Sequence, residues 1–348
     1  MKILLKLTAL LLSLGVALNV AADGGKNHPS YPLLASEFRD LSLLESVRFT
    51  PEQLQDKAKL AELNAAFLQA AEQSAVQPNE KITAPAQEAQ PAVDLYIYRP
   101  ATAKNEKLPV IYFMHGGGYL FGNARQNNAA LAELADLNKA VVVSVEYRLA
   151  SQTPYPADID DAYHGLAYLF KNGQKLNADT NKVVIMGESA GGGLAARLAL
   201  KVRDKGEFKL AGQVLIYPML DYRTGTPQSL YNTPYTGGYV WTAEFNRIGW
   251  ETLRGGQTIA QAEMPYYSAA TATDLAGLPP TYMMVGSLDL FANEDMDYAN
   301  RLVQAGVPTD LQLVSGVYHA FEIFNPNASQ TLAYKLARTN AIQQMLAK

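Results

Sequence analysis

The sequence predicts an α/β architecture, in which a mostly parallel β-sheet is covered by helices on both faces. From about residue 93 onward, short apolar runs alternate with longer helix-like stretches. Several of the runs are β-branched and apolar on both faces, as expected for strands buried between two helix layers. This alternation favours a parallel sheet, because each helix returns the chain to the end of the sheet where the next strand begins.

The elements are expected in a regular order along the chain. The predicted strands are 94–99, 109–114, 140–147, 182–187, 213–218, 280–286 and 309–314. Helices expected between them include 156–171, 190–204 and 293–305. The stretch 225–265 is longer than a simple crossover and is rich in tyrosine, tryptophan and phenylalanine. We therefore expect residues 93–348 to form one catalytic domain, with a cap excursion at about 225–265.

Residues 23–92 are expected to form a helical cap segment followed by a connector. Thr50 and Pro51 are typical of a helix start, and Gln53 stands three residues after the Thr50 cap. Apolar residues that follow fall mostly on one helical face. Segment 76–91 is rich in Pro, Gln, Glu and Ala and is predicted to be the connector.

The first 22 residues have the three-part pattern of a secretory signal peptide. Lys2 and Lys6 precede an apolar run over 7–18, which is shorter than the roughly 20 residues of a spanning helix. Small residues follow before Asp23, so cleavage is predicted after Ala22. The alternative is an uncleaved membrane anchor. Cleavage predicts an exported protein, periplasmic or secreted, without stable membrane insertion.

Composition excludes several classes of function. The formal net charge is −4, from 29 basic and 33 acidic residues, and no Lys/Arg-rich run stands out, so a nucleic-acid partner is not expected. The chain contains no cysteine. Disulfides, a thiolate nucleophile and cysteine-ligated zinc are therefore excluded.

The sequence around Ser189 is typical of a catalytic nucleophile. It reads Gly-Glu-Ser-Ala-Gly over 187–191, after a predicted buried strand and before a predicted helix. In this setting the G-x-S-x-G pattern forms a tight strand-to-helix turn that exposes the serine in a strained conformation. Glycine is needed at Gly187 and Gly191 because a side chain would collide with the neighbouring strand or helix.

A nucleophilic serine requires a base and an acid, which follow it in this order in such folds: acid, then histidine. The histidines of the chain are His28, His115, His164 and His319. Only His319 lies beyond Ser189, just after the last predicted strand. Two acids stand at strand ends, Asp289 and Asp221. We prefer Asp289 because it follows the penultimate strand, and we expect Asp221 to be a loop or cap residue.

A glycine-rich turn can supply donors for the oxyanion of the reaction. His115 is followed by three glycines directly after the predicted strand 109–114. The expected oxyanion-hole donors are the backbone amides of Gly116, Gly117 and Ala190. A phosphate-binding loop is not expected, since no Gly-Lys-Ser/Thr follows. His115 itself is expected to shape the turn.

Together these motifs resemble the hormone-sensitive-lipase-like family of α/β-hydrolases. The resemblance spans about 93–345 and is carried by HGGGY, YRLA, YPADIDDAY, GESAGG, GLPP, GSLDLFANED and GVYHAF. It implies an α/β-hydrolase fold and a serine esterase with an N-terminal helical cap. The family's nucleophile, acid and histidine fall on Ser189, Asp289 and His319. The chain departs from the family at Ala320, where glycine is usual, and at Leu290, where proline is frequent.

The expected activity is cleavage of short- to medium-chain carboxylic esters through an acyl-enzyme on Ser189, without a metal or organic cofactor. Two alternatives remain open at this point. An amidase or peptidase could use the same three residues. A non-catalytic ligand-binding protein on this fold is the other alternative, although such a protein would be expected to have lost part of the triad.

Overall fold

The structure is a computed structural model that describes residues 25–46, 49–103 and 106–347. The predicted signal peptide, residues 1–22, lies outside the described residues. Within the described ranges, no helix is long and apolar enough to cross a membrane.

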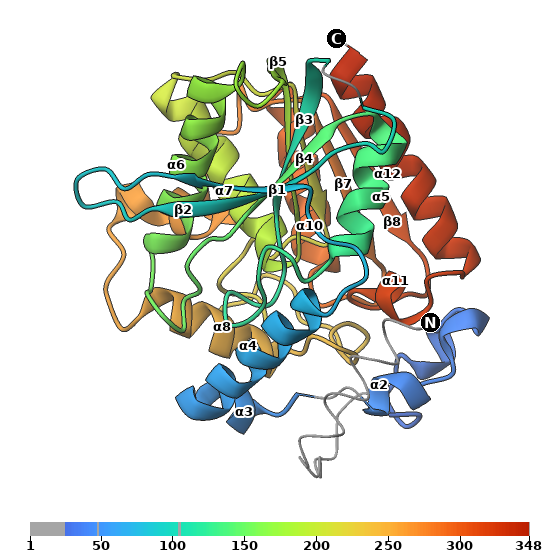
Figure 1. Ribbon diagram of the computed structural model, residues 1–348. Helices are drawn as coiled ribbons and strands as arrows, with labels where there is room; N and C mark the ends of the chain where they lie inside the picture. The colour runs from blue at the N-terminus through green and yellow to red at the C-terminus, as the bar shows by residue number, and fades with distance from the viewer. Residues whose placement is uncertain (1–24, 47–48, 104–105, 348) are drawn as a thin grey trace.

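An eight-stranded sheet forms the centre of the described structure, in the order β1-β2-β4-β3-β5-β6-β7-β8 (Figure 1). The strands from β4 to β8 in this order are parallel, whereas β1 and β2 are antiparallel to their neighbours. Their bounds are β1 Glu80–Ala84, β2 Val93–Tyr98, β3 Leu108–Met114, β4 Val141–Val145, β5 Ala178–Glu188, β6 Gly212–Ile216, β7 Thr281–Gly286 and β8 Thr309–Val314. The mostly parallel sheet predicted from the sequence is confirmed.

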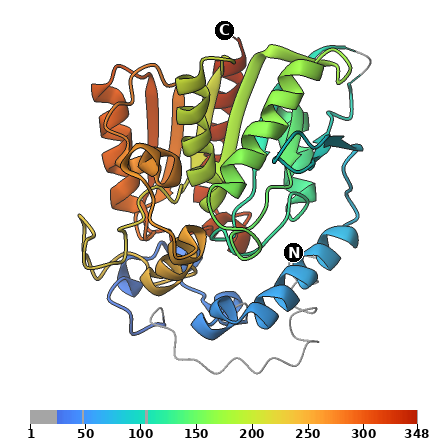
Figure 2. The same cartoon turned by 90° about the vertical axis from the view of Figure 1, so that its left-hand side faces the viewer.

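Helices cover both faces of this sheet, as the buried central strands require. Helices α5 (Asn128–Asn138) and α12 (Ser329–Ala347) contact each other over one face. The opposite face is covered by α6 (Ala157–Asn172), α7 (Ala190–Lys205) and α10 (Ala292–Gln304) (Figure 2). Strands β3, β4 and β6 are almost entirely buried between these layers, as are residues 183–187 of β5. The predicted site residues follow the carboxyl ends of β3, β5, β7 and β8.

The predicted connector 76–91 contains a strand that the sequence analysis did not anticipate. Residues Glu80–Ala84 form β1, which pairs antiparallel with β2, and Lys81 forms an ion pair with Asp94 at 2.7 Å. Most of β1 is exposed because it lies at the edge of the sheet, so it lacks the apolar pattern of a buried strand. The expectation of a simple connector was wrong for these residues.

The helices of the N-terminal segment and of the 225–265 stretch lie together at one end of the sheet (Figure 1). They are α2 Ser42–Ser46, α3 Pro51–Gln55, α4 Lys57–Glu72 and α8 Ala243–Arg254. Helix α3 begins with the predicted Thr50 cap, whose side chain accepts from the Gln53 amide while the Gln53 side chain accepts from the Thr50 amide. Helices α3 and α8 contact each other. This end of the sheet is also where the loops after β3, β5, β7 and β8 emerge.

Side chains from the N-terminal segment attach it to the loops that carry predicted site residues. Asn64 on α4 donates to the Leu120 carbonyl and accepts from the Gly122 amide. Phe38 packs edge-on against Tyr318, the neighbour of His319, at 5.9 Å between ring centroids. The segment is therefore fixed to both the glycine-rich turn and the histidine loop.

Candidate active site

Ser189 lies at the sharp turn between β5 and α7 in a conformation that few L-residues adopt. Its φ is +55° and its ψ is −123°. A Cβ on Gly187 would lie 2.0 Å from the Gly191 carbonyl oxygen, and a Cβ on Gly191 would lie 2.2 Å from the Met114 carbonyl oxygen. Only glycine fits at these two positions, so the sequence pattern is explained by close backbone approach. Backbone strain of this kind is typical of functional sites.

A chain of two hydrogen bonds joins the three residues expected to form the triad. His319 Nε2 lies 2.9 Å from Ser189 Oγ, and His319 Nδ1 lies 2.8 Å from Asp289 Oδ2. The second oxygen of Asp289 accepts from the Phe291 amide at 3.0 Å, which fixes the carboxylate. All three side chains are buried. This arrangement can pass the serine proton to the imidazole and stabilise the imidazolium that results.

Asp221, the alternative acid, forms an ion pair with Arg223. Its two carboxylate oxygens accept from the Arg223 guanidinium at 2.9 and 2.7 Å. Of the two candidates, only Asp289 is within hydrogen-bond distance of His319 in the described structure.

The glycine-rich turn after β3 lies directly beside Ser189. A Cβ on Gly116 would lie 3.2 Å from Ser189 Cβ, and Gly117 has a φ of +132°, which favours glycine. In the described part of the chain, the amides of Gly116 and Gly117 donate to no backbone carbonyl. Ala190 is the first residue of α7, so its amide has no partner within the helix. These three amides are free to bind an oxyanion.

His115 shapes this turn rather than joining the triad. Its Nδ1 lies 2.8 Å from the Gly116 carbonyl oxygen, and its ring stacks on Tyr147 at 4.4 Å between centroids. Burial lowers the pKa of His115 to about 4, so its ring is neutral at neutral pH. The sequence analysis expected this structural role.

Aromatic rings that the sequence analysis did not assign surround His319. Tyr217, Phe291 and Trp241 have ring centroids 4.7, 5.3 and 6.5 Å from the imidazole. Tyr217, which has a φ of +34°, donates its hydroxyl hydrogen bond to Glu322, three residues after His319. These contacts join residues far apart in the sequence, so no local pattern could have revealed them.

Glu188 adds a second acidic group next to the serine. Removal from water raises the pKa of Glu188 to about 7, and the nearby Glu322 carboxylate acts in the same direction. Its Oε2 accepts from the Asn127 amide group at 3.2 Å. In the described part of the chain Glu188 makes no hydrogen bond to His319, so it lies outside the hydrogen-bond chain of the triad.

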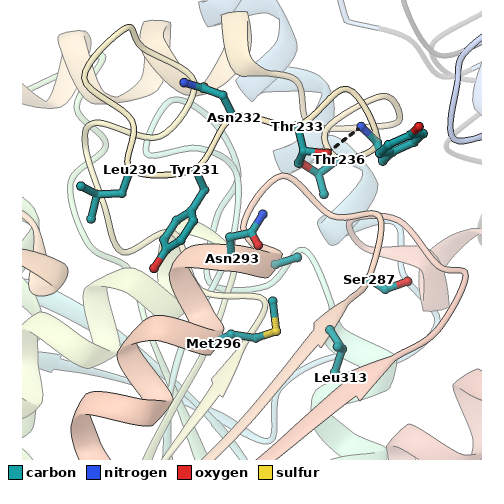
Figure 3. A pocket seen from close by; sticks show the side chains of 11 residues that line it. Leu230, Tyr231, Asn232, Thr233, Thr236, Ser287, Asn293, Met296 and Leu313 are labelled. Carbon is teal, nitrogen blue, oxygen red and sulfur yellow. Dashed lines mark hydrogen bonds between the residues drawn. The ribbon is translucent and has the colours of Figure 1, made fainter.

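Two open cavities lie close to the site without including Ser189, Asp289 or His319. One, of about 470 Å³, lies between the 230–236 loop, α10 and β8, where Tyr231, Asn293 and Leu313 line it (Figure 3). The other, of about 700 Å³, is lined by His28, Pro29, Gly237, Thr242 and Arg247 among others. Ser189 itself is only 7% exposed.

The fold, the strained serine turn and the serine–histidine–aspartate hydrogen bonds define a serine hydrolase of the α/β-hydrolase class. A family model for the alpha/beta hydrolase fold matches residues 111–323. Esterase LipI of Mycobacterium tuberculosis is 31% identical over 227 residues, which are 65% of this chain and 69% of that protein. Carboxylesterase NlhH of the same species is 30% identical over 234 residues, which are 67% of this chain and 72% of that protein.

Solved structures of esterases share this fold over nearly their whole length. A bacterial heroin esterase matches with a TM-score of 0.77 and 29% identity, covering 91% of this chain and 99% of that one. An esterase of the archaeon Pyrobaculum calidifontis matches with a TM-score of 0.75 and 29% identity, over 90% of this chain and 99% of its own. The chain belongs to the hormone-sensitive-lipase-like family of carboxylesterases and is a carboxylic ester hydrolase.

Proposed function

We propose that this enzyme hydrolyses short- to medium-chain carboxylic esters with Ser189 as nucleophile, His319 as general base and acid, and Asp289 as the residue that orients His319. The observation that carries this assignment is the hydrogen-bond chain from Ser189 through His319 to Asp289. A short or medium acyl chain is what the resemblance to carboxylesterases implies, and Ser189 itself is only 7% exposed.

The geometry supports a two-step reaction. Ser189 Oγ attacks the ester carbonyl carbon as its proton passes to His319 Nε2, and the carbonyl oxygen becomes an oxyanion. The amides of Gly116, Gly117 and Ala190 donate to that oxyanion. Collapse of the tetrahedral intermediate breaks the bond to the leaving alcohol, which takes the proton from His319. Water then attacks the acyl-enzyme by the same route and releases the acid and Ser189.

The test is hydrolysis of p-nitrophenyl esters from acetate to palmitate by the parent enzyme and by Ser189→Ala. We expect the parent to prefer short chains, and the variant to lose activity at least about 10³-fold, because the nucleophile acts as a unit with His319. Circular dichroism should show that the variant is folded. If a folded parent cleaves no ester but cleaves the matched anilides, an amidase replaces this proposal.

We also propose that the protein is exported after cleavage following Ala22. The support is the sequence pattern of residues 1–22, with two lysines before a short apolar run and small residues at the cleavage position. N-terminal sequencing of the protein from its source cell is expected to begin at Asp23. An intact Met1 on the mature protein would contradict export by this route.

A further inference from the structure

The stretch that leads into α8 contains a strained turn centred on Val240. Val240 has a φ of +62°, and the Trp241 amide donates to the Tyr239 carbonyl at 2.7 Å, across a single residue. This is the γ-turn form with positive φ, which is rare. A β-branched residue at positive φ is an outlier, and such outliers cluster at functional sites. The turn reverses the direction of the chain between Tyr239 and Trp241.

The indole of Trp241 lies against two parts of the active site at once. A Cβ on Gly118 would lie 2.1 Å from Trp241 Cη2, so the indole rests directly on the backbone next to the proposed oxyanion donors. Its ring centroid is also 6.5 Å from that of His319. Only 4% of Trp241 is exposed. The side chain therefore fills space around the position where an ester group would sit.

Hydrogen bonds fix the indole in this position. Trp241 Nε1 donates to Asn246 Oδ1 at 3.2 Å, and the Asn246 amide donates to the Thr224 carbonyl at 2.8 Å. Asn246 is fully buried on α8. Because Trp241 and Asn246 both lie in the 225–265 stretch and Thr224 directly precedes it, this part of the chain holds the ring in position.

An open cavity lies next to the same turn. The cavity of about 700 Å³ is lined by Gly237 and Thr242, which flank the turn on both sides, and by His28. Tyr239 connects the two regions, because its ring contacts both His28 at 5.6 Å and Tyr318 at 5.5 Å. The cavity therefore lies beside the segment 237–242, which also brings Trp241 next to His319.

We propose that Trp241 is a specificity-determining residue that limits the size of the ester group accommodated at Ser189. The inference rests on the proposed esterase function and adds the residue that sets its range. Removal of the indole joins the space around Ser189 to the neighbouring cavity, so larger acyl or alcohol groups are accepted. Trp241 takes no part in proton transfer or in the binding of the oxyanion.

The first experiment compares kcat/KM of the parent, Trp241→Phe and Trp241→Ala on two series of esters. One series lengthens the acyl chain of p-nitrophenyl esters from acetate to decanoate, and the other enlarges the alcohol of acetate esters. We expect Trp241→Ala to raise the ratio of the largest to the smallest substrate in one series by about tenfold or more, since pocket size discriminates by such factors. The ratio for Trp241→Phe should lie between those of the parent and of Trp241→Ala.

Trp250, which lies on α8, provides a matched control. It is the other tryptophan of the chain, is equally buried, and packs on Tyr119 and Tyr267 instead of on the triad. Trp250→Phe is expected to keep the parental ratios in both series. If Trp241→Ala keeps them as well while the parent is active, the inference is overturned and the proposed function stands. If the parent cleaves no ester, both fail together.

Fluorescence provides a test that does not depend on the fold of Trp241→Ala. The Trp250→Phe variant keeps Trp241 as its sole tryptophan. Diethyl p-nitrophenyl phosphate labels the serine: the Ser189 Oγ–P bond forms as p-nitrophenolate leaves. We expect labelling to change the emission of Trp241, and to leave the emission of the Trp241→Phe variant unchanged. An unchanged Trp241 emission after complete labelling would show that the indole does not border the substrate site.

Discussion

At the scale of single residues, the site contains more acidic groups than its chemistry requires. Asp289 orients His319, whereas Glu188 and Glu322 lie close by without contact with the serine hydroxyl. Removal from water raises the pKa of both glutamates, and Arg338, which is buried, acts in the opposite direction. The turn around Ser189 therefore lies near two carboxyl groups whose pKa values are raised, that of Glu188 to about 7.

This placement predicts a pH-dependent stability for Glu188→Gln. The pKa of Glu188 is about 7 in the folded state against 4.5 for the ordinary group, so the folded state holds the proton more tightly. Parent stability from this source is complete below pH 4.5 and is lost as the pH rises through about 7. The variant should equal the parent near pH 4 and exceed it by up to about 3 kcal/mol above pH 8.

Urea unfolding of the two proteins at both pH values measures this difference. The exposed Glu62 on α4 serves as the control, and Glu62→Gln should change the free energy of unfolding little at either pH. A Glu188→Gln variant that is less stable than the parent at high pH would mean that the charged carboxylate is favoured by its surroundings.

At the scale of elements, α7 shows two different reasons for glycine in one helix. Gly191, in its first turn, lies against the backbone of β3, where a Cβ would meet the carbonyl oxygens of Met114 and His115 at 2.2 and 2.4 Å. Gly206 ends the helix with a φ of +65° and has no neighbouring atom within 4 Å of a Cβ. Gly191 is required because a side chain would not fit there, whereas Gly206 is required because its backbone has a positive φ.

Alanine at Gly191 and at Gly206 is predicted to lower the free energy of unfolding by different amounts. Gly191→Ala should lower the free energy of unfolding by about 3 kcal/mol, because the start of α7 and the end of β3 must move apart. Gly206→Ala should cost about 1 kcal/mol, the usual strain of an L-residue in the left-handed region. Chemical denaturation of both variants measures the difference, and ester hydrolysis should fall only for Gly191→Ala. Equal losses in the free energy of unfolding would mean that the backbone around Gly191 can move to make room for a Cβ.

The elements with strong local patterns were predictable from the sequence, and those without were not. All seven predicted strands are present within a few residues of their expected bounds, because buried parallel strands are continuous apolar runs. Strand β1 escaped prediction since its sequence, Glu-Lys-Ile-Thr-Ala, is short, charged and largely exposed. Its pairing with β2 depends on a partner strand and not on its own composition.

The site could be predicted to a similar extent. Ser189, His319 and Asp289 were identified by chain order and by their positions after strands, and the structure brings the three together. The aromatic residues around them were not assigned. Trp241 contacts Gly118 across 123 positions of sequence, a proximity that only the folded cap creates.

At the scale of the whole molecule, a buried ion pair connects two neighbouring helices that cover the same face of the sheet. Arg197 on α7 binds Asp158 on α6, and both side chains are at most 1% exposed. The same guanidinium donates to the Tyr266 carbonyl and lies 5.0 Å from the ring centre of Tyr119, which follows the proposed oxyanion donors. Two helices, the glycine-rich turn and the segment after α8 therefore meet at this residue.

Removal of one partner is predicted to be more harmful than removal of both. Arg197→Met leaves Asp158 as an unpaired buried charge and should cost about 3–5 kcal/mol of stability. The double variant Arg197→Met/Asp158→Asn should recover much of that loss, since no buried charge remains. Thermal unfolding of the parent, the single variant and the double variant measures this. A double variant no more stable than the single one would contradict this account.

The long sequence separation within the triad has a consequence for the newly made chain. Ser189 and its base, His319, are 130 residues apart, and His319 lies on a loop that follows the last strand of the sheet. On the ribosome, the serine emerges long before the imidazole that activates it. The growing chain thus carries an inert hydroxyl until His319 has been added and can fold against the serine. Hydrolytic activity is acquired only as the final strand joins the sheet edge.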